Sequence, residues 1–217
     1  MPVVPPRRGA SAIVWAALGA LVVLALVLGV WLLLRGGPSS DPKDSRSGAP
    51  QAGAPAEGEN VAGTATASAP VTRPPGEDTQ GNKTSYDASN MLDGDPTTAW
   101  EMPGDGRGKV LTFTLAKRTH LSQVGLINGY AKVGEQDGQK VDWYAGNRRV
   151  LQVEWLFDNG STVTQDLQQT RKLQTTDVDV TTKTVRLRLV EVSGPGEGKA
   201  ARNMTAVSEV RLSGATG

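Results

Sequence analysis

The chain has 217 residues and a formal net charge of +1, so its overall charge does not indicate a nucleic-acid partner. It contains no cysteine, which excludes disulfide bonds and metal sites built on thiolates. Basic and acidic residues also nearly balance from residue 81 onward, without the basic cluster of a nucleic-acid interface. We therefore expect no nucleic acid among its partners.

The N-terminal part of the chain is predicted to be a membrane anchor. Residues 12–34 are apolar without interruption. At about 1.5 Å per residue, a helix of this length reaches roughly 34 Å and can cross a hydrocarbon core of about 30 Å. A cleaved signal peptide is the competing interpretation, but its apolar core spans only about 7–15 residues. Arg7 and Arg8 precede the span and only Arg35 follows it directly. We therefore expect one transmembrane helix, with residues 1–11 in the cytoplasm and the C-terminal part outside.

Residues 35–80 are predicted to be a flexible linker. They are rich in glycine, proline, alanine and serine and contain almost no large apolar side chain. Such a segment cannot bury enough surface to offset the entropy lost on ordering. It would tether the segment that begins at residue 81 to the membrane.

From residue 81 to residue 217 the apolar pattern is that of a β domain. Strands are predicted where apolar and polar residues alternate or where a short apolar run lies between turns, at residues 111–115, 121–127, 151–157, 161–165, 185–189 and 209–212. The turn Asp158-Asn159-Gly160 predicts that two of these strands form a hairpin. No segment of this part has a helical period of useful length, so we expect an all-β fold, a β-sandwich or jelly roll.

The loop Leu92-Asp93-Gly94-Asp95-Pro96-Thr97-Thr98-Ala99-Trp100 resembles the L-D-G-D-x-x-T-x-W loop of discoidin-type (F5/8 type C, galactose-binding-like) domains. The strand at residues 109–115 is similar to the strand that follows this loop in the family. Residues 206–212, AVSEVRL, resemble the family's closing A-[IL]-x-E-[IV] strand. The resemblance implies a jelly-roll β-sandwich, in which Trp100 packs beneath the loop as part of the core.

Two central segments, residues 128–132 and 144–149, resemble one subgroup of this family more closely. The subgroup includes the translocation module of secreted bacterial NAD glycohydrolases and related membrane-anchored actinobacterial proteins. That module is not the catalytic one, so the resemblance implies no NAD chemistry. The chain also lacks a G-x-S-x-G motif and has a single histidine, His120, so we do not expect an enzyme.

The resemblance further implies one structural calcium ion between the loop and the closing strand. Calcium prefers six to eight oxygen ligands, which a short Asp-Gly-Asp turn can help to supply. The family's ligand positions correspond here to the side chains of Asp93, Thr98 and Glu209 and to the backbone carbonyls of Asn90, Asp95 and Ser208. The alternative is a turn without metal, capped by its own side chains.

Discoidin-like domains that bind sugars use the loops at one end of the sandwich. Loop residues of suitable types for an aromatic platform and for planar hydrogen-bond donors are Tyr130, Trp143, Tyr144, Asn147, Arg148, Arg149 and Arg202. Each of them alone is also explained as a solvated side chain or as loop packing. Together they predict a binding surface.

These features predict a membrane-anchored extracytoplasmic binding module that recognises carbohydrate or cell-envelope glycan, with calcium as its cofactor. The alternative is a protein–protein interaction or sensory ectodomain that binds no glycan, in which the same loops contact an envelope protein.

Overall fold

The computed structural model describes residues 58–78, 81–136, 138–198 and 200–215, all within one unit at residues 52–217. The predicted transmembrane segment 12–34 lies outside the described residues. Among the residues that are described, no helix is long and apolar enough to cross a membrane.

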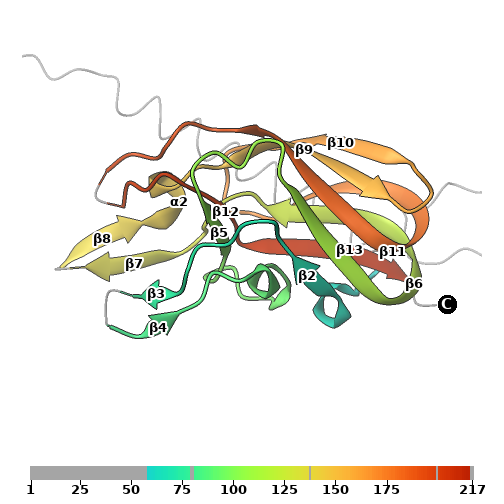
Figure 1. Cartoon of the computed structure of the whole chain (residues 1–217), viewed down its shortest axis with the longest axis horizontal. Helices are drawn as coiled ribbons and strands as arrows, with labels where there is room; N and C mark the ends of the chain where they lie inside the picture. The colour runs from blue at the N-terminus through green and yellow to red at the C-terminus, as the bar shows by residue number, and fades with distance from the viewer. Residues whose placement is uncertain (1–57, 79–80, 137, 199, 216–217) are drawn as a thin grey trace, which may run out of the picture. The chain divides into compact units, whose positions relative to one another are not determined.

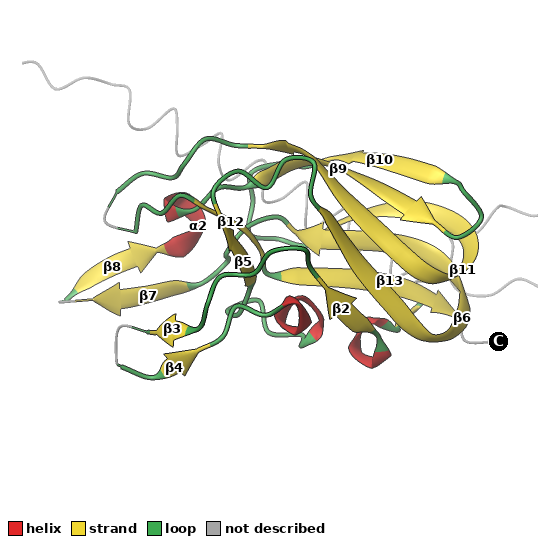
Figure 2. Cartoon of the chain, viewed as in Figure 1, coloured by secondary structure: helices red, strands yellow, loops and turns green. Residues whose placement is uncertain are grey.

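The described residues form an all-β sandwich, as predicted (Figures 1 and 2). Its strands are β1 (Glu59–Asn60), β2 (Thr66–Ser68), β3 (Gly76–Glu77), β4 (Lys83–Thr84), β5 (Trp100–Pro103), β6 (Val110–Ile127), β7 (Val133–Gln136), β8 (Gln139–Asp142), β9 (Val150–Phe157), β10 (Thr162–Asp166), β11 (Gln174–Val192), β12 (Met204–Val207) and β13 (Glu209–Ala215). The helical segments of this part are short turns, namely η1 (Ala62–Thr64), η2 (Ala88–Leu92) and α2 (Trp143–Gly146).

The largest sheet is antiparallel and has the order β1-β13-β6-β11-β9-β10, with β2 pairing on β6 as well. Strand β6 pairs with two different strands besides β11. Its first half pairs with β2 and its second half with β13. Phe113 from the first half and Leu126 from the second both belong to one hydrophobic core. The sheet therefore curves around a single core, and β6 and β11 run through the bend.

The other strands of the described residues form three separate two-stranded sheets, namely the hairpins β3–β4 and β7–β8 and the pair β5–β12. Strand β12 pairs with β5, and after Ser208 the chain continues as β13 in the large sheet. The crossing residue Ser208 is fully buried, and its hydroxyl accepts a hydrogen bond from Ala131 N at 2.9 Å. The last two strands thus connect the β5–β12 pair to the large sheet, next to the loop that precedes β5.

Two tryptophans fill the interior, as their positions in the sequence predict. Trp100 is fully buried, and its Nε1 donates to the carbonyl of Val71 at 3.1 Å. Trp155 is also fully buried, and its Nε1 donates to Gln165 Oε1 at 2.9 Å. Each indole N–H has an acceptor, which a buried donor requires.

The hairpin predicted around the turn Asp158-Asn159-Gly160 is confirmed by the pairing of β9 with β10. The two strands predicted at 111–115 and 121–127 are one continuous strand, β6. The residues between them include Lys117 and Arg118, which are exposed, and their charges indicate an interruption of the strand. Main-chain pairing with β11 nevertheless resumes beyond a register shift, so the strand bends there instead of ending.

The predicted boundary of the linker at residue 80 is wrong for the stretch 58–78. Strand β1 pairs with β13 and strand β2 with β6, and Val61 and Ala62 between them are buried. Composition misses this segment because it contributes small side chains and main-chain hydrogen bonds to existing strands. The main-chain hydrogen bonds and small buried side chains stabilise the segment without the large apolar residues whose absence from a sequence indicates disorder.

Candidate ligand-binding site

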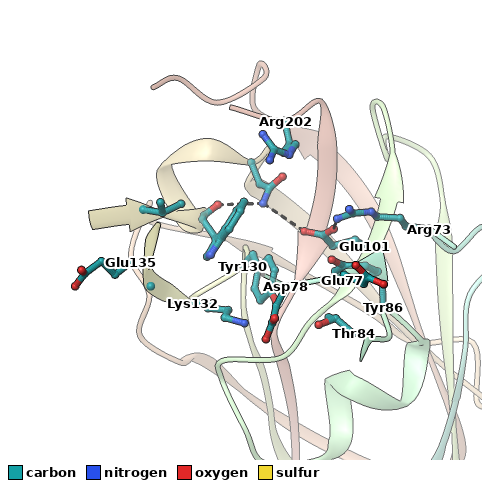
Figure 3. Close-up of a pocket in the computed structure, with 14 residues that line it drawn as sticks. Arg73, Glu77, Asp78, Thr84, Tyr86, Glu101, Tyr130, Lys132, Glu135 and Arg202 are labelled. Carbon is teal, nitrogen blue, oxygen red and sulfur yellow. Dashed lines mark hydrogen bonds and ion pairs between the residues drawn. The ribbon is translucent and has the colours of Figure 1, made fainter. Parts of the chain in front are cut away.

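The hairpins β3–β4 and β7–β8 lie at one end of the sandwich (Figure 1). Residues of these hairpins line a cavity of about 200 Å³ (Figure 3). Its lining combines aromatic residues with charges of both signs. The aromatic residues are Tyr86, Tyr130 and Trp143, the basic ones Arg73, Lys132 and Arg202, and the acidic ones Glu77, Asp78, Glu101 and Glu135. The cavity is thus polar, with an aromatic wall, and is smaller than the about 300–1,000 Å³ of sites for drug-sized ligands.

The aromatic wall consists of Tyr130 and Trp143, whose rings stack with centroids 6.4 Å apart at an interplanar angle of 29°. Helix α2 places Trp143 there, and its N-terminus is capped by Asp142, whose Oδ1 accepts from Ala145 N at 3.0 Å. The guanidinium of Arg202 lies over Trp143, with its carbon 5.5 Å from the ring centroid. Arg202 is exposed, so its other donors are accessible at the rim.

The polar base of the cavity is a buried ion pair. Arg73 Nη1 lies 2.6 Å from Glu101 Oε2, and the Glu101 side chain is only 1% exposed. The guanidinium of Arg73 also stacks over Tyr86, 4.0 Å from the ring centroid. Burial raises the pKa of Glu101 above its ordinary value, although the hydrogen bond and the charge of Arg73 oppose the shift. The pair therefore fixes a charged, oriented surface inside the cavity.

Asn147 extends this polar base. Its Nδ2 donates to Glu101 Oε1 at 3.3 Å and to the carbonyl of Trp143 at 3.1 Å, so the orientation of the amide is set by two acceptors. The other amide atom, Oδ1, is buried and has no hydrogen-bond partner among the described residues. An unpaired buried acceptor costs about 1–3 kcal/mol.

The two tyrosines of the cavity remain neutral hydrogen-bonding groups at physiological pH. Burial is the largest influence on both, and it raises the pKa of Tyr86 and of Tyr130 above the ordinary value of a phenol. Their hydroxyls therefore offer both a donor and an acceptor to a polar ligand.

The structure brings together four of the seven residues predicted to bind ligand. Tyr130, Trp143, Asn147 and Arg202 all line the cavity. They come from three separate segments of the chain, namely the loop after β6, helix α2 with its C-cap residue Asn147, and the loop before β12.

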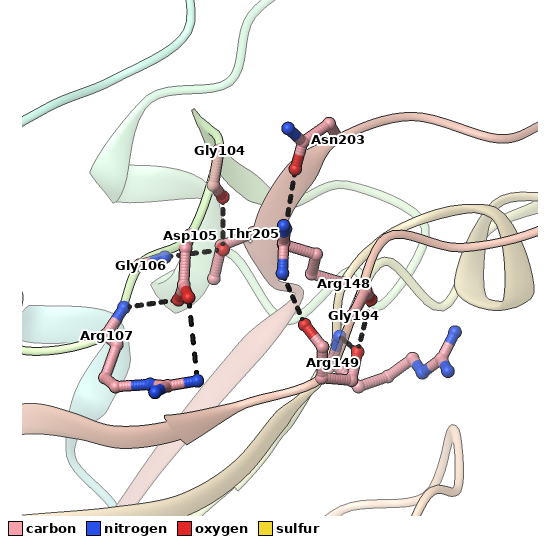
Figure 4. Close-up of polar contacts among 10 residues, drawn as sticks. Gly104, Asp105, Gly106, Arg107, Arg148, Arg149, Gly194, Asn203 and Thr205 are labelled. Atoms are coloured by element: carbon pink, nitrogen blue, oxygen red, sulfur yellow. Dashed lines mark hydrogen bonds and ion pairs between the residues drawn. The ribbon is translucent and has the colours of Figure 1, made fainter.

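The other three predicted ligand-binding residues hold loops in place and do not line this cavity. Tyr144 is buried, and its hydroxyl donates to Asn128 Oδ1 at 2.9 Å. Arg148 donates from Nε to Asn203 Oδ1 and from Nη1 to the carbonyl of Ser193, each at 2.6 Å (Figure 4). The guanidinium of Arg149 donates to three carbonyls of the α2 segment, those of residues 144, 145 and 147. These contacts join α2 to the loops on either side.

Several lining residues were not predicted, above all Arg73, Tyr86, Glu101 and Lys132. Arg73 belongs to the stretch assigned to the linker, and nothing in its neighbourhood indicates a folded segment. The sequence position of Glu101 does indicate a special role, because it lies between the apolar residues Trp100 and Met102 in a short strand. An acid buried there requires a partner.

The loop predicted to bind calcium brings oxygen atoms together. Thr98 Oγ1 lies 2.8 Å from Asp93 Oδ2, 3.1 Å from the carbonyl oxygen of Asp95 and 3.4 Å from that of Asn90. The loop also caps itself, since Asp95 N donates to Asp93 Oδ1 at 2.9 Å. Convergence of these four residues therefore fits both the metal and the metal-free interpretation.

The surroundings of Glu209 distinguish the metal-bound from the metal-free interpretation better than the loop itself does. Its Oε2 is buried and has no hydrogen-bond partner among the described residues. Burial, followed by the negative charge of Asp93, raises the pKa of Glu209 to about 7, although a hydrogen bond from the backbone N of Gly94 opposes the shift. A bare turn leaves one oxygen of this carboxyl group without a partner and close to the negative charge of Asp93, whereas a cation between Asp93 and Glu209 would compensate both.

The donor set suits calcium more than a transition metal. The described residues contain no cluster of three or more histidine, cysteine, aspartate or glutamate side chains placed to hold a metal. The candidate site has two carboxylates, with the other oxygens supplied by a hydroxyl and by backbone carbonyls. Carbonyl, hydroxyl and carboxylate oxygens are what calcium accepts as ligands.

The fold and the cavity define a β-sandwich module with a polar, aromatic-walled pocket at one end. Residues 66–213 match the family model described as the NAD glycohydrolase translocation F5/8 type C domain, and the chain belongs to this family. The match confirms the resemblance of the loop at residues 92–100. No curated protein sequence matches the chain.

Several solved structures are similar in their arrangement of strands. A family 32 carbohydrate-binding module of NanJ from Clostridium perfringens, in complex with galactose, has 16% identity and a TM-score of 0.49, covering 72% of this chain and 98% of that one. A second C. perfringens module, in complex with GalNAc-β-1,3-galactose, has 16% identity and a TM-score of 0.47, covering 70% and 96%. A fucose-binding module from Streptococcus pneumoniae has 15% identity and a TM-score of 0.45, covering 73% and 99%. At these values no conclusion about the ligand of this chain follows.

Proposed function

We propose that this protein is a carbohydrate-binding module that holds one sugar ring in the cavity beside helix α2. The observation that carries the proposal is the combination of a stacked aromatic pair, Tyr130 and Trp143, with the buried polar base of Arg73, Glu101 and Asn147. A sugar ring has an apolar C–H face, which favours an aromatic surface, and hydroxyl groups, which need fixed donors and acceptors. The cavity offers both.

Binding is a better account of this cavity than catalysis. The carboxylate of Glu101 accepts hydrogen bonds from Arg73 on one oxygen and from Asn147 on the other. A carboxylate held in this way orients ligand hydroxyls and is poorly placed to exchange a proton with a substrate. The family description also names a translocation domain of the NAD glycohydrolase and not a catalytic domain.

Replacing Trp143 with alanine is expected to weaken sugar binding at least about tenfold, because the ring supplies most of the accessible aromatic surface of the cavity. Trp143 is only partly buried, so the fold should survive the change. The measurement is calorimetric titration of the full-length protein with a panel of monosaccharides and disaccharides. The protein is kept in a detergent without a sugar headgroup, because such a headgroup would compete.

His120→Ala is the control for this experiment. His120 is exposed, lies on β6 and lines neither the cavity nor its rim. The control should bind sugars like the wild type. If no sugar of the panel binds the wild type, or if Trp143→Ala binds as tightly as His120→Ala, the proposed function is wrong.

The loop at Asp93 is proposed to bind one calcium ion that joins it to strand β13. Asp93, Thr98 and Glu209 would contribute side-chain oxygens, and Asn90, Asp95 and Ser208 backbone carbonyls. The ion would supply charge compensation and a cross-link between the loop and the last strand, and no chemistry is assigned to it. Support comes from the unpaired Oε2 of Glu209 and from the oxygens that converge on Thr98.

The module is proposed to act outside the cell membrane, anchored by the apolar segment 12–34. Support comes from the length of this segment and from Arg7 and Arg8 before it. Alkaline carbonate is expected to leave the full-length protein in the membrane fraction. Protease added to intact cells, or to spheroplasts where an outer layer shields the membrane, is expected to digest the sandwich. Release by carbonate, or protection of the sandwich until the membrane is opened, would contradict this arrangement.

A further inference from the structure

The cavity beside helix α2, lined among others by Tyr130, Trp143 and Glu101, is called the sugar cavity below. A second cavity, of about 250 Å³, adjoins it. Thr84, Tyr130 and Lys132 line both, so the two spaces share a wall (Figure 3). The second cavity is bounded on its other sides by Lys83 of strand β4 and by the loop that carries Thr98. We call this second cavity the basic groove.

The two cavities differ in charge. Four acidic side chains line the sugar cavity, alongside three basic ones. The basic groove is lined by Lys83 and Lys132, and none of its lining residues is an aspartate or a glutamate. Its remaining lining residues are neutral and mostly carry hydroxyl groups. The lining of the groove is therefore positively charged, although Asp95 of the adjoining loop lies within electrostatic range of Lys132.

Neither lysine is committed to an ion pair within the described part of the chain. Glu77 lies opposite Lys83 in the β3–β4 pairing, but it lines the sugar cavity and forms no ion pair with that lysine. Lys132 contributes to a lowered pKa of Asp95, but that carboxylate is engaged first by hydrogen bonds from the side chain and the backbone N of Thr97. Both ammonium groups thus remain available to an anion in the groove.

The hydroxyl groups around the groove are partly in use. Ser85 donates to Asp87 Oδ2 at 2.8 Å, and Thr97 donates to Asp95 Oδ1 at 2.7 Å. These contacts turn the hydroxyl donors toward carboxylates that do not line the groove. The hydroxyl of Tyr130 can still donate to a ligand, but the charge of an anion would be recognised by the two lysines, which can be tested by removing their charges.

We propose that the basic groove binds an anionic substituent of the same glycan whose sugar ring occupies the neighbouring cavity, so that the module prefers acidic over neutral saccharides. The inference rests on the proposed function, because the shared wall of Tyr130 and Lys132 is what places the two groups on one ligand. The chemistry required is an anionic oxygen group, either the carboxylate of a uronic acid or a sugar phosphate.

The test compares sugars that differ only at carbon 6. Galactose, galacturonic acid and galactose 6-phosphate form one series, and glucose, glucuronic acid and glucose 6-phosphate form the other. Each is titrated into the full-length protein in a detergent without a sugar headgroup. In at least one series, the acidic member is expected to bind about three- to tenfold more tightly than the neutral one, the range that two partly exposed charge pairs supply. Whether the uronic acid or the phosphate gains more identifies the source of the anion.

The variant Lys83→Gln/Lys132→Gln removes both charges and keeps most of each side-chain stem. It is expected to bind the acidic and the neutral sugar equally well. Lys83→Gln alone changes a residue that does not line the sugar cavity, and it is expected to lose part of the preference while keeping its affinity for the neutral sugar within about twofold of the wild type. Lys172→Gln is the matched control, because Lys172 is exposed and lines neither cavity. It should keep the full preference. Circular dichroism and the two single variants establish that the double variant is folded.

Three results would overturn the inference while leaving the proposed function in place. They are equal affinity of the wild type for acidic and neutral sugars, a preference that survives in Lys83→Gln/Lys132→Gln, and a loss of neutral-sugar binding in Lys83→Gln. If the wild type binds no sugar of either series, the proposed function fails and this inference fails with it. Added salt should also reduce the preference of the wild type, because it screens the lysines.

Discussion

Replacing Arg73 with alanine is expected to lower the free energy of unfolding by about 3 kcal/mol, because it leaves the carboxylate of Glu101 buried without its counter-charge. The Glu101 side chain is 1% exposed and that of Arg73 27%, so we take the lower end of the about 3–5 kcal/mol typical of broken buried pairs. The stacking of Arg73 over Tyr86 is lost as well. Urea unfolding of the full-length protein measures the difference.

The pH dependence of this loss has a definite sign. Burial already raises the pKa of Glu101, and removing Arg73 raises it further. A carboxyl group with a raised folded-state pKa lowers the free energy of unfolding as the pH rises from its unfolded pKa to its folded one, and it has no such effect below its unfolded pKa. The deficit of Arg73→Ala should therefore be largest at neutral pH and shrink as the pH falls toward about 4.

Two variants make this prediction specific. Adding Glu101→Gln to Arg73→Ala should recover much of the stability, because a neutral amide needs no counter-charge. Arg188→Ala breaks an exposed pair, in which Arg188 Nη1 lies 2.8 Å from Glu154 Oε2, and should cost less than about 1 kcal/mol. Equal losses in Arg73→Ala and Arg188→Ala would mean that the buried pair has no special role.

Removing calcium with a chelator is expected to lower the thermal unfolding midpoint by about 5–10 °C. A ligand at about a hundred times its dissociation constant stabilises the folded state by about 2.7 kcal/mol, and each kcal/mol shifts the midpoint by about 2–4 °C in a protein of this size. The comparison is made on the full-length protein, with calcium and with chelator. Asp93→Asn and Glu209→Gln should each abolish the difference, whereas Asp105→Asn, an exposed residue outside the loop, should retain it.

Glu209→Gln provides a second, independent readout. Without metal, burial and the charge of Asp93 disfavour the ionised form of Glu209, whose pKa is about 7. In chelator at pH 8, the neutral amide should therefore be at least as stable as the wild type, although it is less stable in calcium. If the wild type melts at one temperature with calcium and with chelator, the loop is a turn capped by its own side chains, as the hydrogen bond from Asp95 N to Asp93 allows.

Much of the fold follows from the alternation of apolar and polar residues. It predicts β9 and β10 and the turn between them, because one face of each strand packs on the core and the other is solvated. It does not predict β1 and β2, whose short strands are ordered by pairing with β13 and β6. Pairing partners distant in the sequence leave no trace in a local pattern.

The candidate site shows the same limit. Trp143 and Tyr144 are neighbours in the sequence and look equally suited to a ligand. Helix α2 directs Trp143 to the cavity, whereas Tyr144 is buried and bonds to Asn128. Arg73 and Glu101 form their ion pair although they lie 28 positions apart in the sequence, so a local sequence pattern does not predict the contact. Residue types indicate what a site could contain, and the path of the chain decides which of them meet.

The most direct test of sugar binding in the cavity uses the indole N–H groups as reporters. Trp100 and Trp155 donate to Val71 and Gln165 in the interior, whereas Trp143 lines the cavity. A ¹H–¹⁵N correlation spectrum of the full-length protein is recorded while the best-binding sugar is added. We predict that the Trp143 signal shifts and saturates with the dissociation constant found by calorimetry, while those of Trp100 and Trp155 stay in place. A Trp143 signal that does not move while the sugar binds would show that the ligand lies elsewhere.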